Sequence, residues 1–441
     1  MSAPLQPRPL LERLFHAAVR RALPSEVLRP HLPPPPRGRT LVLGAGKAAA
    51  AMAQALEAVW PADAPLTGLV VTRYGHQPLR PQGLAQRIDV VEAAHPVPDQ
   101  ASHDAALRLL ALAGRGWTRD DLVICLLSGG GSSLATLPVE GLDLAGKQRI
   151  HRALLECGAD IHAINGVRKH LSRIKGGRIA TACWPAPVIT LAISDVPGDD
   201  IGTIASGPTV ADATDCAQAL HTLDRYGIAL PWGVRAALAA GTLETPKPGD
   251  PRLAGHEAHL VATPGQALEA AAEEARQQGI EVRILGDAIE GESRVVGMEH
   301  AALVQVFIAA SQERQTPLLL LSGGETTVTL AAGREGRTRG RGGRAGEFCL
   351  GLTAGLRGRA HVWALAADTD GIDGVEDNAG AFVGPDTLAR AQALGLSLNG
   401  HMERNDAYGY FAALGDLFIT GPTHTNVNDF RAILIDGPAR T

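Results

Sequence analysis

Short apolar runs alternate with longer segments of helical hydrophobic spacing along most of the chain. Continuous apolar runs such as Leu122–Leu127 and Val188–Ile193 are typical of strands buried on both faces of a sheet. Between such runs, segments such as 102–112 and 266–277 repeat apolar residues at helical spacing. Strands that alternate with helices predict parallel sheets with helices on both faces. We therefore expect an α/β fold with largely parallel sheets.

The same pattern predicts the other elements. Further strands are expected at 41–43, 69–72, 88–91, 259–262, 281–285, 318–321, 361–366 and 417–420. Further helices are expected at 10–19, from the turn after residue 43 to about 59, across the basic stretch 144–179, and at 293–310. The segment 241–256 is polar and rich in Pro and Gly, and the alternation restarts after it. We therefore expect an N-terminal Rossmann-like α/β domain over 1–245 and a C-terminal α/β domain over 246–441.

One short motif occurs once in each predicted domain. LLSGGGSS at 126–133 and LLSGGETT at 320–327 share an apolar strand, Ser-Gly-Gly and a pair of hydroxyl residues. Successive backbone amides in a glycine turn can bind an anion, and neighbouring hydroxyls add donors; the alternative is an ordinary strand-to-helix turn. The candidate phosphate-binding residues are Ser128, Gly129, Gly130, Gly131, Ser132, Ser133, Ser322, Gly323, Gly324, Glu325 and Thr326.

A third glycine turn, GAGK at 44–47, follows the first predicted strand. With Ala49 it satisfies G-x-G-x-x-A, the pattern of dinucleotide-binding folds, but the second strand ends in Thr72-Arg73 without the expected acidic residue. It is not a P-loop, because Ala48 stands where Ser or Thr is needed. A turn without a ligand is the simpler interpretation. Lys47 favours a ligand, because a cation at a helix N-terminus opposes the helix dipole unless an anion offsets it.

Basic residues gather in two other segments. NGVRKHLSRIKGGR at 165–178 is either a solvated helix face or part of the lining of a triphosphate site. Its S-x-x-K pattern at Ser172 and Lys175 lacks the companion motifs of acyltransferases, so we attribute it to chance. In GRGGR at 340–344, Arg341 and Arg344 offer forked donors suited to a carboxylate or a phosphate.

Carboxylates follow two predicted strands, in SDVPGDD at 194–200 and in DTDGIDG at 368–374. Strand ends are where α/β sheets place ligands, and Mg²⁺ is held in proteins by one or two carboxylates plus phosphate oxygens. Asp195 and Asp370 are therefore candidate metal ligands. Simple Asx turns are the alternative in both places. The second segment resembles part of a calcium loop but lacks the distal Glu.

Composition excludes several functions. The net charge of −5 gives no footprint for nucleic-acid binding. The five cysteines follow no metal-binding spacing, which is typical of reduced thiols in the cytoplasm. No apolar run approaches the ~20 residues that span a bilayer. We expect a cytoplasmic enzyme with a small-molecule substrate and no nucleic-acid or membrane partner; a homodimer stays an open alternative.

Taken in order, the motifs resemble those of the class II glycerate kinases, the MOFRL group, some of which carry the older label hydroxypyruvate reductase. The resemblance covers about residues 10–435. Its motifs are GAGKAA at 44–49, HPVPD at 95–99, SGGGSS at 128–133, ISDVPGDD at 193–200, SGPT at 206–209, SGGETT at 322–327, GRGGR at 340–344, TDGIDG at 369–374 and TGPT-TNVND at 420–429.

The resemblance implies a smaller C-terminal MOFRL-type domain and an active-site cleft between the two domains. It points to Lys47 and an arginine of GRGGR, Arg341 or Arg344, for substrate binding and catalysis, and to Asp195 as a metal or acid–base residue. The chain departs from the family pattern at Ala345, where Asn is usual, and at His424, where Gly is frequent. These departures affect the expected substrate affinity rather than the reaction.

The resulting hypothesis is ATP-dependent phosphorylation of D-glycerate to 2-phosphoglycerate, with ATP and Mg²⁺ as cofactors. Such a reaction needs alignment and charge neutralisation more than covalent help from the protein. The Ser128–Ser133 loop would hold ATP phosphates, and Lys47 with one arginine would hold the glycerate carboxylate and the transferring phosphoryl group. The alternatives are an NADPH-dependent hydroxypyruvate reductase, favoured by the GAGKAA turn and Arg73, and a non-catalytic anion sensor.

Overall fold

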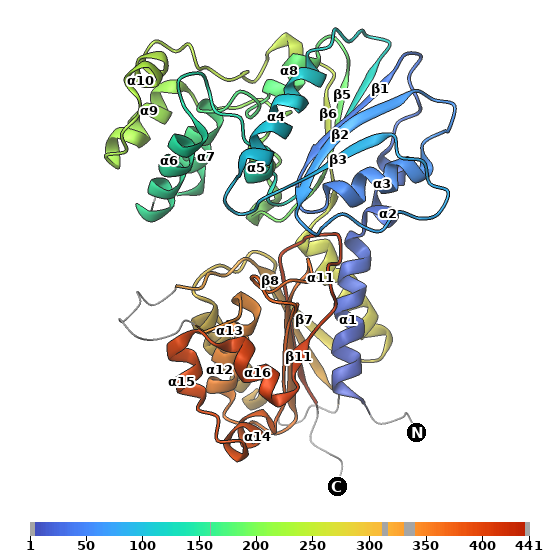
Figure 1. Ribbon diagram of the computed structural model, residues 1–441. Helices are drawn as coiled ribbons and strands as arrows, with labels where there is room; N and C mark the ends of the chain where they lie inside the picture. Colours follow the sequence, from blue (N-terminus) through green and yellow to red (C-terminus); the bar gives the residue numbers. More distant parts are fainter. Residues whose placement is uncertain (1–4, 159, 311–315, 330–339, 437–441) are drawn as a thin grey trace. The chain divides into compact units, whose positions relative to one another are not determined.

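The computed structural model describes residues 5–158, 160–310, 316–329 and 340–436, which form two compact units (Figure 1). The N-terminal unit comprises Pro24–Ser194 and Asp199–Val261. The C-terminal unit comprises Met1–Leu23, Asp195–Gly198 and Ala262–Thr441. None of the described helices combines the length and the apolar character needed to cross a membrane.

The N-terminal unit is built on a six-stranded sheet with the order β3-β2-β1-β4-β5-β6. The strands are β1 (Thr40–Ala45), β2 (Leu66–Arg73), β3 (Ile88–Ala93), β4 (Leu122–Leu127), β5 (Val188–Ile193) and β6 (Glu257–Ala262). β1 pairs in parallel with β2 and β4, and the pairs β2–β3 and β4–β5 are parallel too. The predicted parallel α/β sheet is therefore confirmed for this unit.

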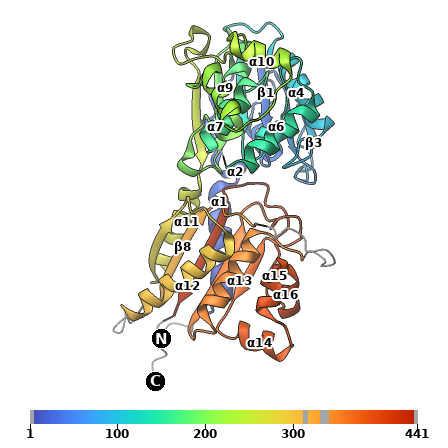
Figure 2. The same ribbon diagram turned by 90° about the vertical axis from the view of Figure 1, so that its left-hand side faces the viewer.

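Helices surround this sheet and form a second apolar core beside it. The longer ones are α3 (Ala49–Val59), α4 (Gln100–Ala113), α6 (Leu144–Glu156), α7 (Ile161–His170), α9 (Cys216–Arg225) and α10 (Trp232–Ala239); the shorter ones are α2 (Pro24–Val27), α5 (Gly131–Leu134) and α8 (Arg178–Cys183). Helices α4 and α8 pack on alternate residues of the sheet, including Leu41, Leu43 and Ala45 of β1. Helices α6, α7, α9 and α10 share their own core, and Figure 2 shows them grouped together.

The sheet of the C-terminal unit is mixed. Its order is β11-β10-β9-β12-β8-β7, formed by β7 (Glu281–Gly286), β8 (Leu318–Gly324), β9 (Val362–Asp368), β10 (Gly380–Val383), β11 (Leu417–Phe418) and β12 (Asp429–Ile435). Only β7 and β8 pair in parallel among the described strand pairs; β12 runs antiparallel to both of its neighbours, β8 and β9. The expectation of a largely parallel second sheet is corrected here, because β12 and β10 run against the strands beside them.

This topology gathers one set of strand ends. In the register of β12, Asp429 lies opposite Gly324 of β8 and opposite Asp368 of β9. Since β12 is antiparallel to both, its first residue meets the carboxyl ends of β8 and β9. The loops that follow β8 and β9 therefore emerge beside Asp429.

Helices cover both faces of the second sheet. They are α1 (Pro7–Ala22), α11 (Pro264–Gln277), α12 (Ser293–Ala309), α13 (Arg344–Leu356), α14 (Thr387–Ala393), α15 (Leu398–Arg404) and α16 (Ala407–Leu414). Helix α1, from the start of the chain, packs on α11 and on β12, so the blue helix in Figure 1 lies against the late elements of the sequence. Helices α12, α13 and α16 contribute to the core on the side away from α1.

The boundaries of the two compact units differ from the predicted domain boundary between residues 245 and 246. The polar segment 241–256 lies inside the N-terminal unit, because the strand after it, β6, completes the first sheet next to β5. Residues 1–23 belong to the C-terminal unit, because the apolar face of α1 packs there. The predicted basic helix 144–179 is three helices, and strands β10 and β12 were not predicted.

Candidate active site

In the N-terminal unit, the GAGK turn and the SGGGSS loop lie side by side at the centre of the sheet. The turn follows β1 and the loop follows β4, and these two strands are neighbours. The sheet order reverses its direction between them, and this is the point where ligands bind in open α/β sheets. The Lys47 amide donates to Gly129 O at 2.8 Å and the Ala48 amide to Ser128 Oγ at 3.0 Å, so the two motifs form one structure.

These contacts occupy the amides of the GAGK turn. The amide of Gly46 donates to Val71 O and that of Ala49 to Gly46 O, so four consecutive amides from Gly46 to Ala49 donate within the protein. A side chain at residue 46 would stand 2.1 Å from Ser128 Oγ, and Gly46 has a φ of +144°. The glycine therefore permits the close approach of β4, whereas a dinucleotide turn would direct its amides at a pyrophosphate.

The SGGGSS loop differs from the GAGK turn in how its backbone amides are used. In the described part of the chain, the amides of Gly129 and Gly130 have no protein acceptor. Gly130 has a φ of +78°, and a Cβ there would lie 2.8 Å from His95 Cδ2, so the imidazole packs directly on the loop. Ser132 Oγ lies 2.7 Å from Ser206 Oγ of the SGPT motif. Ser133 Oγ donates to Gly130 O at 3.1 Å. Free amides in a partly exposed turn are suited to anion binding.

Buried cations lie next to this loop. Lys175, 3% exposed, donates to Ser132 O at 2.8 Å. Lys147, 7% exposed, donates to the carbonyls of Arg168 and Leu171. The guanidinium of Arg168 contacts His151 and Asn165. None of the three cations Lys147, Arg168 and Lys175 pairs with a carboxylate of the described residues, so the cluster carries uncompensated positive charge.

Burial and mutual repulsion lower the pKa values of the basic groups in this cluster. Burial, with the Arg168 charge nearby, lowers the pKa of Lys147 to about 7. Burial and the charges of Lys147 and Arg168 lower the pKa of Lys175 well below its usual value. Burial lowers the pKa of Arg168 to about 10. Of the two alternatives for this basic segment, a solvated helix face is therefore wrong for Lys175, which is buried and donates to the loop, whereas Arg168 is half-buried.

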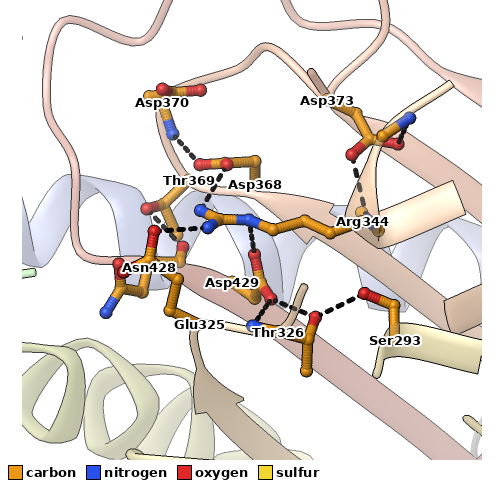
Figure 3. Close-up of polar contacts among 12 residues, drawn as sticks. Ser293, Glu325, Thr326, Arg344, Asp368, Thr369, Asp370, Asp373, Asn428 and Asp429 are labelled. Carbon is orange, nitrogen blue, oxygen red and sulfur yellow. Dashed lines mark hydrogen bonds and ion pairs between the residues drawn. The ribbon is translucent and has the colours of Figure 1, made fainter. Parts of the chain in front are cut away.

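In the C-terminal unit, Arg344 is surrounded by carboxylates (Figure 3). Its three guanidinium nitrogens lie 2.6 Å from Glu325, 2.8 Å from Asp368 and 2.7 Å from Asp429. These contacts raise the pKa of Arg344 even though burial acts in the opposite direction. Arg344 is the first residue of α13, whereas the three acids follow β8, end β9 and start β12. The register of β12 therefore assembles this cluster.

A second buried arginine extends the cluster. Arg431 on β12 pairs with Asp429 and donates to Gly323 O at 3.0 Å. Thr326 Oγ1 donates to Asp429 Oδ2 at 3.1 Å and accepts from Ser293 Oγ at 2.8 Å (Figure 3). The cluster thus holds three carboxylates and two guanidinium groups, and each carboxylate pairs with at least one of these arginines.

The second Ser-Gly-Gly motif does not form a loop. Ser322, Gly323 and Gly324 are the last residues of β8 and pair with β12. Ser322 Oγ lies 3.0 Å from Nε2 of His300. A Cβ on Gly324 would stand 2.2 Å from the Ile289 amide, so this glycine permits close packing. The expected phosphate-binding turn is corrected here, because the antiparallel strand β12 uses this backbone.

Arg341 lies apart from the Arg344 cluster. Its exposed guanidinium pairs with Glu376 at 2.5 Å and stacks on the ring of Tyr408. Asp373 accepts hydrogen bonds from the amides of Ala345 and Gly346 and so caps α13. Burial raises the pKa of Asp373 to about 7.

The loop 420–428 links the two candidate metal ligands. Asp370 O accepts the amide of Thr423. Asp195 Oδ2 accepts Asn426 Nδ2 at 3.0 Å, and Asp195 O accepts Asn428 Nδ2 at 2.6 Å. Asp195 is therefore bound into the C-terminal unit, and its local partners are the amides of the TNVND motif.

The two departures from the family pattern have structural explanations. Ala345 is buried in the apolar core of the C-terminal unit, where its methyl group packs. His424 has a φ of +62°, in the left-handed region that favours glycine. Neither residue alters a charged group of the cluster around Arg344.

Several residues around these sites were not singled out from the sequence. They are His95, Lys147, Ser206, Ser293, Asp368, Asp429 and Arg431. For His95, Ser206 and Asp429, the only signal was their position inside the ordered motifs HPVPD, SGPT and TNVND. Nothing local marks Lys147 or Arg431 as buried, since each occupies a segment that contains other polar residues.

The fold and these side chains define a two-unit α/β protein with clustered ionisable groups at the strand ends of both sheets. Residues 10–239 match a family described as a domain of unknown function (DUF4147), and residues 318–429 match the MOFRL family. The chain belongs to the class II glycerate kinase family, the MOFRL group.

Similar proteins extend over nearly the whole chain. A D-glycerate 2-kinase of Thermotoga maritima is 36% identical over 93% of this chain and 94% of its own length. A protein of Agrobacterium vitis named "Putative hydroxypyruvate reductase" is 51% identical over 97% of this chain and 94% of its own length. The crystal structure of a glycerate kinase from Thermotoga maritima superimposes with a TM-score of 0.84 at 35% identity, covering 97% of this chain and 99% of that one.

Proposed function

We propose that this protein is a glycerate 2-kinase, which transfers the γ-phosphoryl group of ATP to the 2-hydroxyl of D-glycerate and forms 2-phosphoglycerate. The similarity to a D-glycerate 2-kinase extends through both units. The structural observation that carries the proposal is the buried cation cluster beneath the SGGGSS loop. Three basic side chains without carboxylate partners, one of which contacts the loop with the free amides at the reversal point of the sheet, favour a polyanion such as a nucleotide triphosphate.

In this proposal the N-terminal unit binds the phosphates of ATP. The amides of Gly129 and Gly130 and the hydroxyl of Ser132 supply the donors. Lys175, which donates to the carbonyl of Ser132, adds the field of a buried charge. Lys47, in the turn after β1, stabilises the charge on the transferring phosphoryl group, because catalysis of this reaction is mainly positioning and electrostatics.

The residues that would hold Mg²⁺ are Asp195 and Asp370. Their donor set fits, because Mg²⁺ prefers oxygen ligands and is held through one or two carboxylates together with phosphate oxygens. When bound, the ion neutralises phosphate charge. Asn426 and Asn428 keep Asp195 in one orientation, so these amides act as positioning residues.

The glycerate carboxylate is assigned to the arginines of GRGGR. Arg344 is held by three acids, of which Glu325 is half exposed whereas Asp368 and Asp429 are buried. A substrate carboxylate would therefore replace Glu325 on Arg344 more readily than either aspartate. Arg341 is the exposed alternative, and it already binds one carboxylate, that of Glu376.

Hydroxypyruvate reduction with NADPH is the second candidate. It is favoured by the relative with that name, by the strand order of the first sheet and by Arg73 at the end of β2. Against it, the amides of the GAGK turn donate to protein acceptors, including Ser128 Oγ. The buried cations and the carboxylates at the second sheet have no role in hydride transfer.

One pair of assays distinguishes the two functions. The purified protein is incubated with D-glycerate, ATP and Mg²⁺, and separately with hydroxypyruvate and NADPH. We expect 2-phosphoglycerate in the first reaction, identified by ³¹P NMR, and loss of turnover on chelation of the metal. Rapid oxidation of NADPH without formation of phosphoglycerate would establish the reductase instead.

A further inference from the structure

A separate group of ligand-type side chains lies among the helices of the N-terminal unit. His170 is the last residue of α7, Cys216 is the first residue of α9, and Glu244 follows α10. One ring nitrogen, the sulfur and one carboxylate oxygen of these residues all lie within 4.8 Å of one another. The three residues come from different elements of the helical group labelled in Figures 1 and 2. None of them has a role in the proposed phosphoryl transfer.

His170 is oriented as metal-binding histidines usually are. Its side chain is fully buried, and Nδ1 donates to Gly166 O at 2.8 Å. Because Nδ1 is the donor to this carbonyl, the neutral ring has its lone pair on Nε2. Nε2 has no hydrogen-bond partner among the described residues, and it lies 3.9 Å from Glu244 Oε1. A buried lone pair that faces a carboxylate oxygen is unfavourable unless a cation lies between them.

Cys216 and Glu244 complete the donor set. The Cys216 side chain is buried, and its amide donates to Glu244 Oε1 at 2.5 Å. Burial and the hydrogen bond to the Glu244 carboxylate raise the pKa of the Cys216 thiol to about 12. Glu244 is partly exposed, which gives an ion access from solvent.

We propose that His170 Nε2, Cys216 Sγ and the Glu244 carboxylate bind a zinc-class divalent ion. Imidazole and thiolate are ligands for Zn²⁺ and related transition metals, whereas Mg²⁺ and Ca²⁺ require oxygen ligands throughout. A tetrahedral ion would take these three ligands and one water at the exposed side. A metal-binding histidine usually donates its other ring N–H to a protein acceptor, which fixes the tautomer and the ring plane. The hydrogen bond from Nδ1 to the Gly166 carbonyl does this for His170.

One proton leaves when the ion binds. The thiol loses its proton to solvent as the Cys216 sulfur–metal bond forms, so the ion is held by one thiolate and one carboxylate. Lys247 Nζ, 2.5 Å from Glu244 Oε2, keeps its charge and holds the outer oxygen. The other charged groups near His170 are Asp212, which pairs with Lys169, and Arg178, which binds the carbonyls of Leu243 and Glu244. The bound ion would fasten α7 and the segment of Glu244 to α9.

The test uses Co²⁺ as the probe on the full chain after removal of metal by a chelator. We expect one equivalent to bind, with a tetrahedral visible spectrum and a near-ultraviolet thiolate-to-cobalt band, displacement by Zn²⁺, and release of one proton per ion. Cys216→Ser removes the thiolate band. His170→Gln and Glu244→Gln keep the thiol but each remove a direct ligand. Loss of an outer hydrogen-bond partner of a ligand already costs up to ~100-fold in metal affinity, so each variant should weaken binding by at least that factor. Cys157→Ser, at a half-buried cysteine outside the group, leaves the spectrum unchanged.

These readouts do not depend on the proposed kinase activity. Failure to bind one equivalent of Co²⁺ would overturn the site. So would a thiolate band that persists in Cys216→Ser, or undiminished affinity in His170→Gln. If the Cys216→Ser protein does not fold, the metal affinities of His170→Gln and Glu244→Gln still test the site, because both variants keep Cys216.

Discussion

The guanidinium of Arg344 lies 2.8 Å from the carboxylate of Asp368, and this ion pair joins the start of α13 to the end of β9. Arg344 also pairs with Asp429, which is 2% exposed. Removing one partner of a buried ion pair leaves uncompensated charge and typically costs about 3–5 kcal/mol. Arg344→Ala should therefore reduce the free energy of unfolding by about that amount, as well as reducing activity. Urea denaturation measures the change.

Arg359→Ala, at an exposed arginine of the same unit, is the matched control and should shift the urea midpoint little. An Arg344→Ala protein as stable as the wild type would show that the cluster contributes no net stability. For the same reason, loss of activity in Arg344→Ala alone does not assign Arg344 to the substrate.

Lys47 allows a test of catalysis in which, unlike for Arg344, little change in stability is expected. It precedes α3, where a cation opposes the helix dipole by ~0.3–1 kcal/mol, so its removal should leave the melting temperature within a few degrees of wild type. Loss of one preorganised donor typically lowers turnover by ~10²–10³-fold. Lys47→Ala should lower kcat/KM for glycerate phosphorylation to that extent. Arg119→Ala, an exposed arginine of the same unit, should leave both quantities unchanged. Retention of more than a tenth of the wild-type kcat/KM would remove Lys47 from the site.

Lys175 should show opposite effects on stability and on ATP binding. Burying an ammonium group without a carboxylate partner is unfavourable, so Lys175→Met, of similar volume, should raise the melting temperature. Loss of a charged donor near the loop should weaken ATP binding by about 10-fold to 100-fold. Isothermal titration calorimetry measures the affinity, with Arg119→Ala again as the control. A variant that binds ATP as tightly as the wild type would exclude the cluster from the nucleotide site.

Lys147 predicts a specific pH dependence of stability. Its pKa is about 7 in the folded protein against 10.5 for an ordinary lysine, so the unfolded chain binds more protons between these values. Stability then rises with pH across that window. The free energy of unfolding of the wild type, measured relative to Lys147→Met, should therefore increase from about pH 7 towards pH 10. A difference that stays constant with pH would show that Lys147 titrates normally.

ATP binding should reverse this shift, because a polyanion near the cluster favours the protonated lysines. Binding near pH 8 should therefore take up protons, and the uptake should fall in Lys147→Met. Calorimetry in buffers of different ionisation enthalpy detects it. Equal apparent enthalpies in all buffers would contradict the proposed position of the triphosphate.

The local pattern was sufficient for many elements. The bounds predicted for β4 and β5 match the structure, and the helix expected at 293–310 is α12, Ser293–Ala309. A strand buried on both faces needs an unbroken apolar run, and an amphipathic helix needs apolar residues at helical spacing, so both are visible within a short window of sequence. The order of the motifs was enough to indicate the family.

Partners distant in the sequence were decided only by the tertiary structure. β12 was not predicted because it contains Arg431, whose charge is compensated by Asp429 and whose other acceptor, Gly323 O, lies on β8. β6 has an ordinary strand pattern, but periodicity does not say which sheet a strand joins. The basic segment 165–178 is compatible with a solvated helix, and only the contact with the SGGGSS loop shows that Lys175 is buried. The sequence by itself determined the elements and the family, and the tertiary structure decided which charges are buried together, because burial depends on contacts that no local window contains.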